Sequence, residues 1–207
     1  MPLVYQQNIN AHTRLGVWHI AEDESYFLER VPLQKEITHP HKRLQHLAGR
    51  LLLGELYEDF PIRLIQIADT KKPYLPGEAF HFSISHCGDY AAAIVSRENR
   101  VGVDIEIPQQ KIEKIRHKFL STQEQQLLHA INTDSLKSLT MAWSIKESMF
   151  KWYAAGKVDF REHMHISECR MSDNQFSATC TFQKEEPVTL KVNGIFFNEN
   201  CLTWLYT

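Results

Sequence analysis

The stretch Val101-Gly102-Val103-Asp104-Ile105-Glu106-Ile107 alternates apolar and polar residues. A period of two predicts a β-strand, because successive side chains of a strand point to opposite faces. One face would carry four β-branched residues and pack in a core, and the other would carry Gly102 and the two acids. The pattern therefore predicts two carboxylates side by side, roughly 6–7 Å apart, with the glycine leaving room beside them.

A second stretch, Trp143-Ser144-Ile145-Lys146-Glu147-Ser148-Met149-Phe150-Lys151, predicts a helix. Trp143, Glu147 and Lys151 stand at i, i+4 and i+8, so they share one stripe of that helix. A third carboxylate and a cation can thus approach the first two, which suits Mg²⁺ and a polyanionic substrate. Each pattern also has an ordinary interpretation, a solvated strand face and a Glu–Lys pair that stabilises a helix by about 0.2–0.5 kcal/mol.

The composition is that of an ordinary soluble protein, with 207 residues, 43% hydrophobic and 23% charged. This length fits one large domain or two small ones. A net charge of −2 gives no general attraction to nucleic acid or anionic membranes. No segment has the length and hydropathy of a membrane span, and no secretory signal pattern is present, so we expect a cytoplasmic protein.

The four cysteines have no C-x-x-C spacing and are too dispersed for a disulfide framework, so we expect reduced thiols. Two histidine pairs, His39-Pro40-His41 and His163-Met164-His165, have no partner cluster at zinc-site spacing. The sequence therefore favours an oxygen-ligand metal site over a zinc or thiolate site.

The periodicity predicts an α+β fold of two pseudo-symmetric lobes, residues 1–100 and 101–207, each a small, mainly antiparallel sheet packed with helices. In the first lobe we expect helices at 23–30 and 41–57, and strands at 15–20, 62–68, 80–85 and 90–96. In the second lobe we expect a strand ending at 107, a helix to about 130 opened by a capping box at Ser121-Thr122-Gln123-Glu124, and a helix at 135–155 capped by Asp134. Strands should follow near 165–171, 175–183, 188–192 and 201–206.

The segment Phe80-His81-Phe82-Ser83-Ile84-Ser85-His86 predicts a strand that ends in a hydroxyl and an imidazole. These groups could bind phosphate oxygens, and no nucleophile elbow is present, which excludes serine hydrolysis. The preceding Lys71-Lys72-Pro73-Tyr74 could place an ammonium at a phosphate or a carbonyl at a base edge, although a solvated turn is the simpler interpretation.

In this order and spacing, Lys72-Pro73, the 82–86 strand, the 101–106 strand and the 143–151 helix closely resemble the 4'-phosphopantetheinyl transferases. The resemblance is to the longer, two-lobed, monomeric branch of the surfactin-synthetase-activating type, and it runs from about residue 41 to 157. It implies transfer of the 4'-phosphopantetheine arm of coenzyme A to a serine of an apo acyl, polyketide or peptidyl carrier protein, with release of 3',5'-ADP.

The resemblance also implies roles for individual residues. Mg²⁺ would be held by Asp104 and Glu106, with Glu147 as the third ligand or as the base for the carrier serine, and with a water as the alternative base. Lys151 would assist the leaving group, and Mn²⁺ stays an alternative ion. The catalytic residues would be Asp104, Glu147 and Lys151. Coenzyme A would bind through Lys151 and a set in the first lobe: Ser85, His86 and Arg50 at the 3'-phosphate, and Lys72 and Pro73 at the adenine.

Two departures from the family pattern bear on these roles. Ala155-Gly156-Lys157-Val158 lacks the second glycine of the usual Gly-Lys-Gly-Leu, and Lys42 or Arg43 are alternatives to Arg50. A basic cluster after the carboxylate strand could dock an acidic helix of a carrier protein, although a solvated helix face is simpler. Its members are Lys111, Lys114, Arg116 and Lys118.

Two other functions remain open. A metal-dependent phosphodiesterase would use the same carboxylates, would hydrolyse a nucleotide ester without an acceptor protein, and would need a second ligand cluster. A non-catalytic coenzyme A binding protein would keep its ligand affinity after loss of Asp104.

Overall fold

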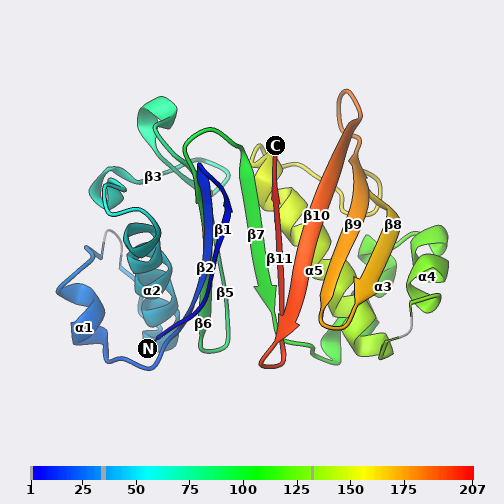
Figure 1. The fold of residues 1–207 in the computed structure, drawn as a ribbon, viewed down its shortest axis with the longest axis horizontal. Coiled ribbons are helices and arrows are strands. Elements are labelled where there is room, and N and C mark those ends of the chain that lie inside the picture. The colour runs from blue at the N-terminus through cyan, green and yellow to red at the C-terminus, as the bar shows by residue number, and fades with distance from the viewer. Residues whose placement is uncertain (1, 34–35, 132) are drawn as a thin grey trace. The chain divides into compact units, whose positions relative to one another are not determined.

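The computed structural model describes residues 2–33, 36–131 and 133–207, and the chain divides into two compact units, Met1–Val101 and Gly102–Thr207. Each unit has a sheet with helices packed against it (Figure 1). The predicted α+β class, with small antiparallel sheets covered by helices, is confirmed. No helix in the described ranges is both long and apolar enough to cross a membrane.

The first unit contains a four-stranded sheet in the order β1-β2-β6-β5, in which neighbouring strands are antiparallel. The strands are β1 (Leu3–Asn10), β2 (Thr13–His19), β5 (His81–Cys87) and β6 (Tyr90–Ser96). Helix α2 (Pro40–Leu56) packs on β2, β5 and β6, and α1 (Glu24–Leu28) packs on α2. The connection from α2 to β5 contains η1 (Ile62–Leu64), η2 (Pro76–Glu78) and a two-stranded pair of β3 (Gln66–Ile67) and β4 (Pro73–Tyr74).

Helix α2 begins where the sequence provides a start signal and approaches β5 closely at a glycine. Pro40 occupies the first turn, and the His39 ring accepts a hydrogen bond from the Lys42 amide. A Cβ atom on Gly49 would lie 2.6 Å from Cγ2 of Ile84. The missing side chain therefore lets α2 pack directly on β5, and it places Arg50 beside that contact.

The second unit contains a five-stranded sheet in the order β7-β11-β10-β9-β8 (Figure 1). Its strands are β7 (Val101–Glu106), β8 (Met164–Ser172), β9 (Gln175–Phe182), β10 (Val188–Phe197) and β11 (Asn200–Tyr206). Its helices are α3 (Lys111–Phe119), α4 (Thr122–His129) and α5 (Ser135–Tyr153). Helix α5 packs on β8, β10 and β11, while α3 packs on α5.

Both predicted helix starts of the second unit are present. Ser121 accepts a hydrogen bond from the Glu124 amide, and the Glu124 carboxylate accepts one from the Ser121 amide, which completes the capping box. Asp134 accepts hydrogen bonds from the amides of Leu136 and Lys137 at 2.9 and 3.2 Å. The first cap fixes where α4 begins, and the Asp134 cap fixes where α5 begins and therefore which residues of α5 face the sheet.

Three strand predictions were wrong or incomplete. Residues 62–68 form η1 and the short β3, and Leu64 and Ile67 are exposed, so apolar composition gave a false strand signal there. Strand β1 was missed because its apolar–polar alternation is broken: apolar Val4 is exposed, and polar Gln7 lies on the half-buried face. Strand β10 continues past the predicted end at residue 192. Gly194 does not end the strand, because the Phe176 ring packs where a Cβ atom of residue 194 would lie.

Candidate active site

The carboxylate of Asp104 is buried in the second unit, with 2% of the residue exposed. Two side chains of α5 donate to it: Ser144 Oγ to Oδ2 at 2.8 Å, and Lys151 Nζ to Oδ1 at 2.7 Å. A buried charge is stable only when it is paired and hydrogen-bonded, and these two contacts meet that requirement. Asp104 is thus fixed in orientation by the helix that also carries Glu147.

Thr203 of strand β11 supports the contact between Ser144 and Asp104. Thr203 is fully buried, and its hydroxyl donates to the backbone carbonyl of Ser144 at 2.8 Å. The Thr203 and Ser144 hydroxyl oxygens lie 2.9 Å apart. Thr203 therefore holds Ser144 in the position from which it reaches Asp104, a role that the sequence analysis did not predict.

Glu106 is oriented by an aromatic side chain. Trp143 Nε1 donates to Glu106 Oε1 at 3.1 Å. The indole ring packs against Phe119 and Phe160, with ring centroids 5.2 and 5.5 Å away. These contacts hold the indole in place, so the Glu106 carboxylate has a fixed hydrogen-bond donor.

Glu147 lies in the electrostatic field of both other carboxylates. Burial and then the charge of Asp104 raise the pKa of Glu147 from 4.5 to about 7, the charge of Glu106 adds to the increase, and Lys151 opposes it. The structure thus brings Asp104, Glu106, Glu147 and Lys151 into one neighbourhood. A carboxyl group with a pKa near 7 can accept a proton at neutral pH, as a general base must.

This pKa predicts a pH dependence of stability in the metal-free protein. The folded state keeps the Glu147 proton up to about pH 7, whereas the unfolded chain releases it near its ordinary value. The contribution of Glu147 to stability should therefore fall as pH rises from about 4.5 to 7 and stay constant above that range. Urea unfolding of wild-type and Glu147→Gln protein should show the variant gaining stability relative to wild type between pH 5 and pH 8. A difference independent of pH would contradict the raised pKa.

The predicted magnesium ligands do not form a preassembled cage. Within residues 2–33, 36–131 and 133–207, no group of three or more His, Cys, Asp or Glu side chains has the arrangement of a metal site. Mg²⁺ is commonly bound by one or two carboxylates together with waters and substrate phosphates, so it does not require such a cage. Asp104, Glu106 and Glu147 fit this mode of binding, because all their donor atoms are oxygens. The repulsion of Glu147 by the other two carboxylates also favours a cation between them.

Gly102 has a different role from the expected one. The sequence predicted that it leaves room beside the carboxylates, but a Cβ there would clash with the Ser148 carbonyl and lie 2.9 Å from the Trp152 amide. The space is therefore filled by the backbone of α5. This close approach brings β7 and α5 together and covers the polar face of β7, which the alternation alone suggested was open.

Arg50 in the first unit is a buried cation. It is 5% exposed, and burial lowers the pKa of Arg50 to about 10. Its Nη1 lies 3.1 Å from His46 Nδ1, and its Nε has no hydrogen-bond partner among the residues that the structure describes. A buried guanidinium with an unused N–H favours an anionic ligand.

The structure places Ser85 and His86 at the same end of β5 but on opposite faces. Ile84 faces α2 at Gly49, so strand alternation puts His86 on the α2 face and Ser85 on the other. Ser85 is buried and His86 is exposed. Adjacency in sequence therefore does not bring both side chains to the face that carries Arg50.

Lys72 and Pro73 lie at the start of the short β4 strand, where Pro73 pairs with Ile67. Burial, and next the positive charge of Arg100, lower the pKa of Lys72 to about 8. Two neighbouring cations favour the binding of an anion. The sequence analysis did not predict that Arg100 contributes positive charge beside Lys72. The alternative cation Arg43 is engaged elsewhere, because its guanidinium donates to both oxygens of Glu24.

Lys146, in the middle of the 143–151 stretch, lies away from the carboxylates. It is fully buried and forms an ion pair of 2.7 Å with Glu124 of α4. It also donates to three backbone carbonyls, those of Phe119, Phe160 and Met164. Lys146 thus fixes α5 to its surroundings, a structural role that the sequence analysis missed.

Comparison with known proteins identifies similar chains. The model of the 4'-phosphopantetheinyl transferase superfamily matches residues 100–202. Enterobactin synthase component D of Salmonella typhi is 34% identical over 116 residues, covering 55% of this chain and 49% of that protein. The 4'-phosphopantetheinyl transferase AcpT of Escherichia coli O157:H7 is 28% identical over 174 residues, covering 79% and 86%. The chain thus spans about half the length of the enterobactin synthase relative.

Proposed function

Because the chain belongs to the 4'-phosphopantetheinyl transferase superfamily, we propose that it transfers the 4'-phosphopantetheine arm of coenzyme A to a serine of an apo carrier protein. The other product is 3',5'-ADP. The observation that carries the proposal is the buried Asp104, paired with Lys151 and placed near a Glu147 whose pKa is about 7. This combination supplies charge neutralisation and a proton acceptor, the two requirements of attack on a pyrophosphate.

The chemical step assigns a role to each group. The serine oxygen attacks the phosphorus that carries the pantetheine arm, and the bond from that phosphorus to the bridging oxygen breaks. Glu147 takes the serine proton, for which its raised pKa suits it. The ammonium of Lys151 stabilises the negative charge that develops on the leaving phosphate.

We propose that Asp104 and Glu106 hold Mg²⁺ together with the pyrophosphate, and that Glu147 is a third ligand only where a water takes the serine proton in its place. When bound, the ion neutralises phosphate oxygens and so lowers the barrier to attack. The all-oxygen donor set and the hydrogen bonds from Ser144 and Trp143 support this assignment. The chain's own contribution is to hold the carboxylates in fixed orientations before the substrate arrives.

We further propose that the first unit binds the nucleotide part of coenzyme A. Arg50 and His86 would contact the 3'-phosphate, with Ser85 next to His86 in sequence, and Lys72 and Pro73 would border the adenine. The unused N–H of the buried Arg50 supports the phosphate assignment. Because the sequence resembles the two-lobed, monomeric branch of the family and coenzyme A is an intracellular cofactor, we propose a cytoplasmic monomer.

The Arg50→Met variant tests the assignment to the 3'-phosphate. Loss of one charge-assisted interaction of about 1.5–3 kcal/mol should raise KM for coenzyme A by about 10- to 100-fold. KM for 3'-dephospho-coenzyme A should stay within about twofold of wild type, because that substrate lacks the group recognised. Steady-state kinetics with both substrates give the answer, and an equal increase for both would show that Arg50 acts elsewhere.

The proposed activity is tested by incubating the protein with coenzyme A, Mg²⁺ and a panel of apo carrier proteins. Intact-mass spectrometry should show one phosphopantetheine added per carrier, and release of 3',5'-ADP should require the carrier. Cleavage of coenzyme A without a carrier would indicate the phosphodiesterase instead. Binding of coenzyme A with neither reaction would indicate the non-catalytic alternative.

A further inference from the structure

Among the buried hydroxyl groups of helix α5, one is bonded differently from the others. Three of them donate to a backbone carbonyl three or four residues earlier in the same helix: Ser138, Thr140 and Ser148. This is a common way for a helix to satisfy a serine or threonine hydroxyl. The hydroxyl of Ser144, which is fully buried, instead reaches Asp104 of β7 and Thr203 of β11. Ser144 therefore joins the helix to two strands of the sheet.

Thr203 is a polar residue in an otherwise apolar row of β11. Cys201, Thr203 and Leu205 share one face of the strand, because side chains alternate between faces, and all three are fully buried. Cys201 and Leu205 belong to the same apolar core as Ile145 and Met149 of α5. Valine has nearly the shape of threonine and would fill this position without needing a hydrogen bond. Packing alone therefore does not explain the hydroxyl of Thr203, whereas its contacts with Ser144 do.

The two hydroxyl groups have one proton each, and these protons order the contacts into a chain. Ser144 Oγ lies 2.8 Å from Asp104 Oδ2. A carboxylate is a stronger acceptor than a neutral oxygen, so the Ser144 proton goes to Asp104. Thr203 Oγ1 lies 2.8 Å from the carbonyl oxygen of Ser144 and 2.9 Å from its hydroxyl oxygen. Whichever of these oxygens accepts its proton, Thr203 is the donor and Ser144 the middle of a chain that ends at Asp104.

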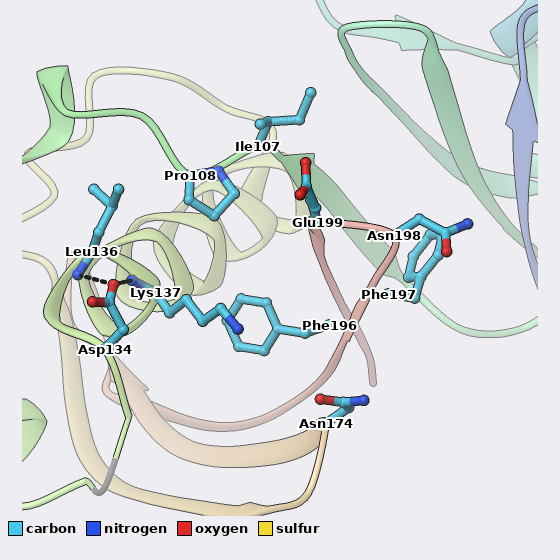
Figure 2. Close-up of a pocket in the computed structure, with 10 residues that line it drawn as sticks. All are labelled: Ile107, Pro108, Asp134, Leu136, Lys137, Asn174, Phe196, Phe197, Asn198 and Glu199. Carbon is cyan, nitrogen blue, oxygen red and sulfur yellow. Dashed lines mark hydrogen bonds between the residues drawn. The ribbon is translucent and has the colours of Figure 1, made fainter.

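This chain lies apart from two hollows of the second unit. The larger hollow, of about 490 Å³, lies where α5 begins and where β10 turns into β11 (Figure 2). The smaller, of about 100 Å³, is lined in part by Glu106. In the part of the chain that the structure describes, Ser144 and Thr203 line neither of these two hollows. Because both residues are also fully buried, they can act on a substrate only through Asp104.

We propose that Thr203 is a positioning residue for the transfer reaction: through Ser144 it holds the Asp104 carboxylate in the orientation that the proposed Mg²⁺ site requires. The inference rests on the proposed function and adds a residue that touches neither substrate nor ion. Lys151 cannot replace this contact, because its ammonium binds Oδ1, the other oxygen of the carboxylate. Residues that hydrogen-bond a metal ligand typically change metal affinity or activity by about 10- to 100-fold when they are replaced.

The test is a double-mutant cycle with Thr203→Val and Ser144→Ala, measured as kcat for transfer to an apo carrier protein at saturating coenzyme A. Ser144→Ala should lower kcat by about 10- to 100-fold. Thr203→Val should lower it by about three- to tenfold, the effect of one hydrogen bond between neutral groups. If Thr203 acts through Ser144, Thr203→Val should cause no further loss in the Ser144→Ala protein. Losses that multiply in the double variant would overturn the proposal, and so would a wild-type kcat in either folded single variant.

Calorimetric titration of coenzyme A gives a readout that a purely structural role of Thr203 would not move. Without Mg²⁺, Thr203→Val should bind coenzyme A as wild type does, whereas the increase in affinity caused by Mg²⁺ should be smaller than in wild type. Thr203→Ser keeps the hydroxyl and should restore kcat and this increase to within about twofold of wild type. An undiminished increase in Thr203→Val, or no rescue by serine, would contradict the proposal.

The matched control is Thr13→Val in the first unit, which carries none of the proposed magnesium ligands. Thr13 is fully buried, and its hydroxyl donates to the Ser96 hydroxyl at 2.9 Å, so the substitution breaks the same kind of contact. It should leave kcat and the effect of Mg²⁺ unchanged, and a loss equal to that of Thr203→Val would overturn the proposal. Transfer by wild type together with an unaffected Thr203→Val variant overturns this inference alone. No transfer by wild type to any carrier overturns the proposed function and, with it, this inference.

Discussion

Asp104→Asn is expected to lower kcat for phosphopantetheine transfer by about 10²–10³-fold, the loss typical when a group that organises transition-state charge is removed. The asparagine keeps the shape and can still accept the hydrogen bond from Ser144. It removes the charge that pairs with Lys151 at 2.7 Å and that raises the pKa of Glu147. Both the proposed cation site and the proposed base are therefore altered by one substitution.

The measurement is the initial rate of carrier modification at saturating coenzyme A, with circular dichroism as the check on folding. Asp173→Asn is the matched control, because Asp173 is exposed in the β8–β9 turn at φ 53°, a conformation that asparagine adopts readily. The control should retain wild-type activity. If the Asp104→Asn enzyme is folded and its rate lies within tenfold of wild type, Asp104 is not a catalytic residue.

Lys146→Met is expected to lower the free energy of unfolding by about 3–5 kcal/mol, the range for breaking a buried ion pair by removing one partner. Glu124 is 3% exposed, and the substitution would leave its charge without the ammonium. Three carbonyls would lose their donor in the same step. Glu124 also accepts hydrogen bonds from the backbone amides of Ser121 and Ile166. The loss of stability should therefore extend to α4 and β8.

Urea unfolding of the purified variants gives the comparison. Lys137→Met removes a lysine from an exposed position of the same helix and should change stability by less than about 0.5 kcal/mol. The double variant Lys146→Met/Glu124→Gln should recover part of the loss, since it removes the unpaired charge. Equal free energies of unfolding for Lys146→Met and Lys137→Met would show that the buried Lys146–Glu124 pair does not stabilise the fold.

Local patterns in the sequence predicted much of the second unit. The alternation at 101–107 gave β7, the Ser121–Glu124 box gave the start of α4, and Asp134 gave the start of α5. Each of these signals depends on residues only a few positions apart, which is why sequence alone was sufficient. The same reasoning failed at 62–68, where apolar residues lie exposed in a connection.

The contacts that orient the site could not be predicted in this way. Thr203 and Ser144 are 59 residues apart, and no periodicity relates them. Gly102 looked like open space, because nothing local shows that α5 backbone fills it. Strand alternation alone could have separated Ser85 from His86, but the family resemblance placed them together. Long-range packing therefore decides how the predicted residues are held, even where their identity was predicted.

The most direct test of the central claim is calorimetric titration of coenzyme A into wild-type and Asp104→Asn protein, with and without Mg²⁺. If the carboxylates hold the ion against the pyrophosphate, Mg²⁺ should raise the affinity of wild type for coenzyme A by at least about fivefold, the lower end of typical coupling between two ligands. The variant should show no such increase. Equal affinities of wild type with and without Mg²⁺, or an increase that survives in Asp104→Asn, would contradict the account.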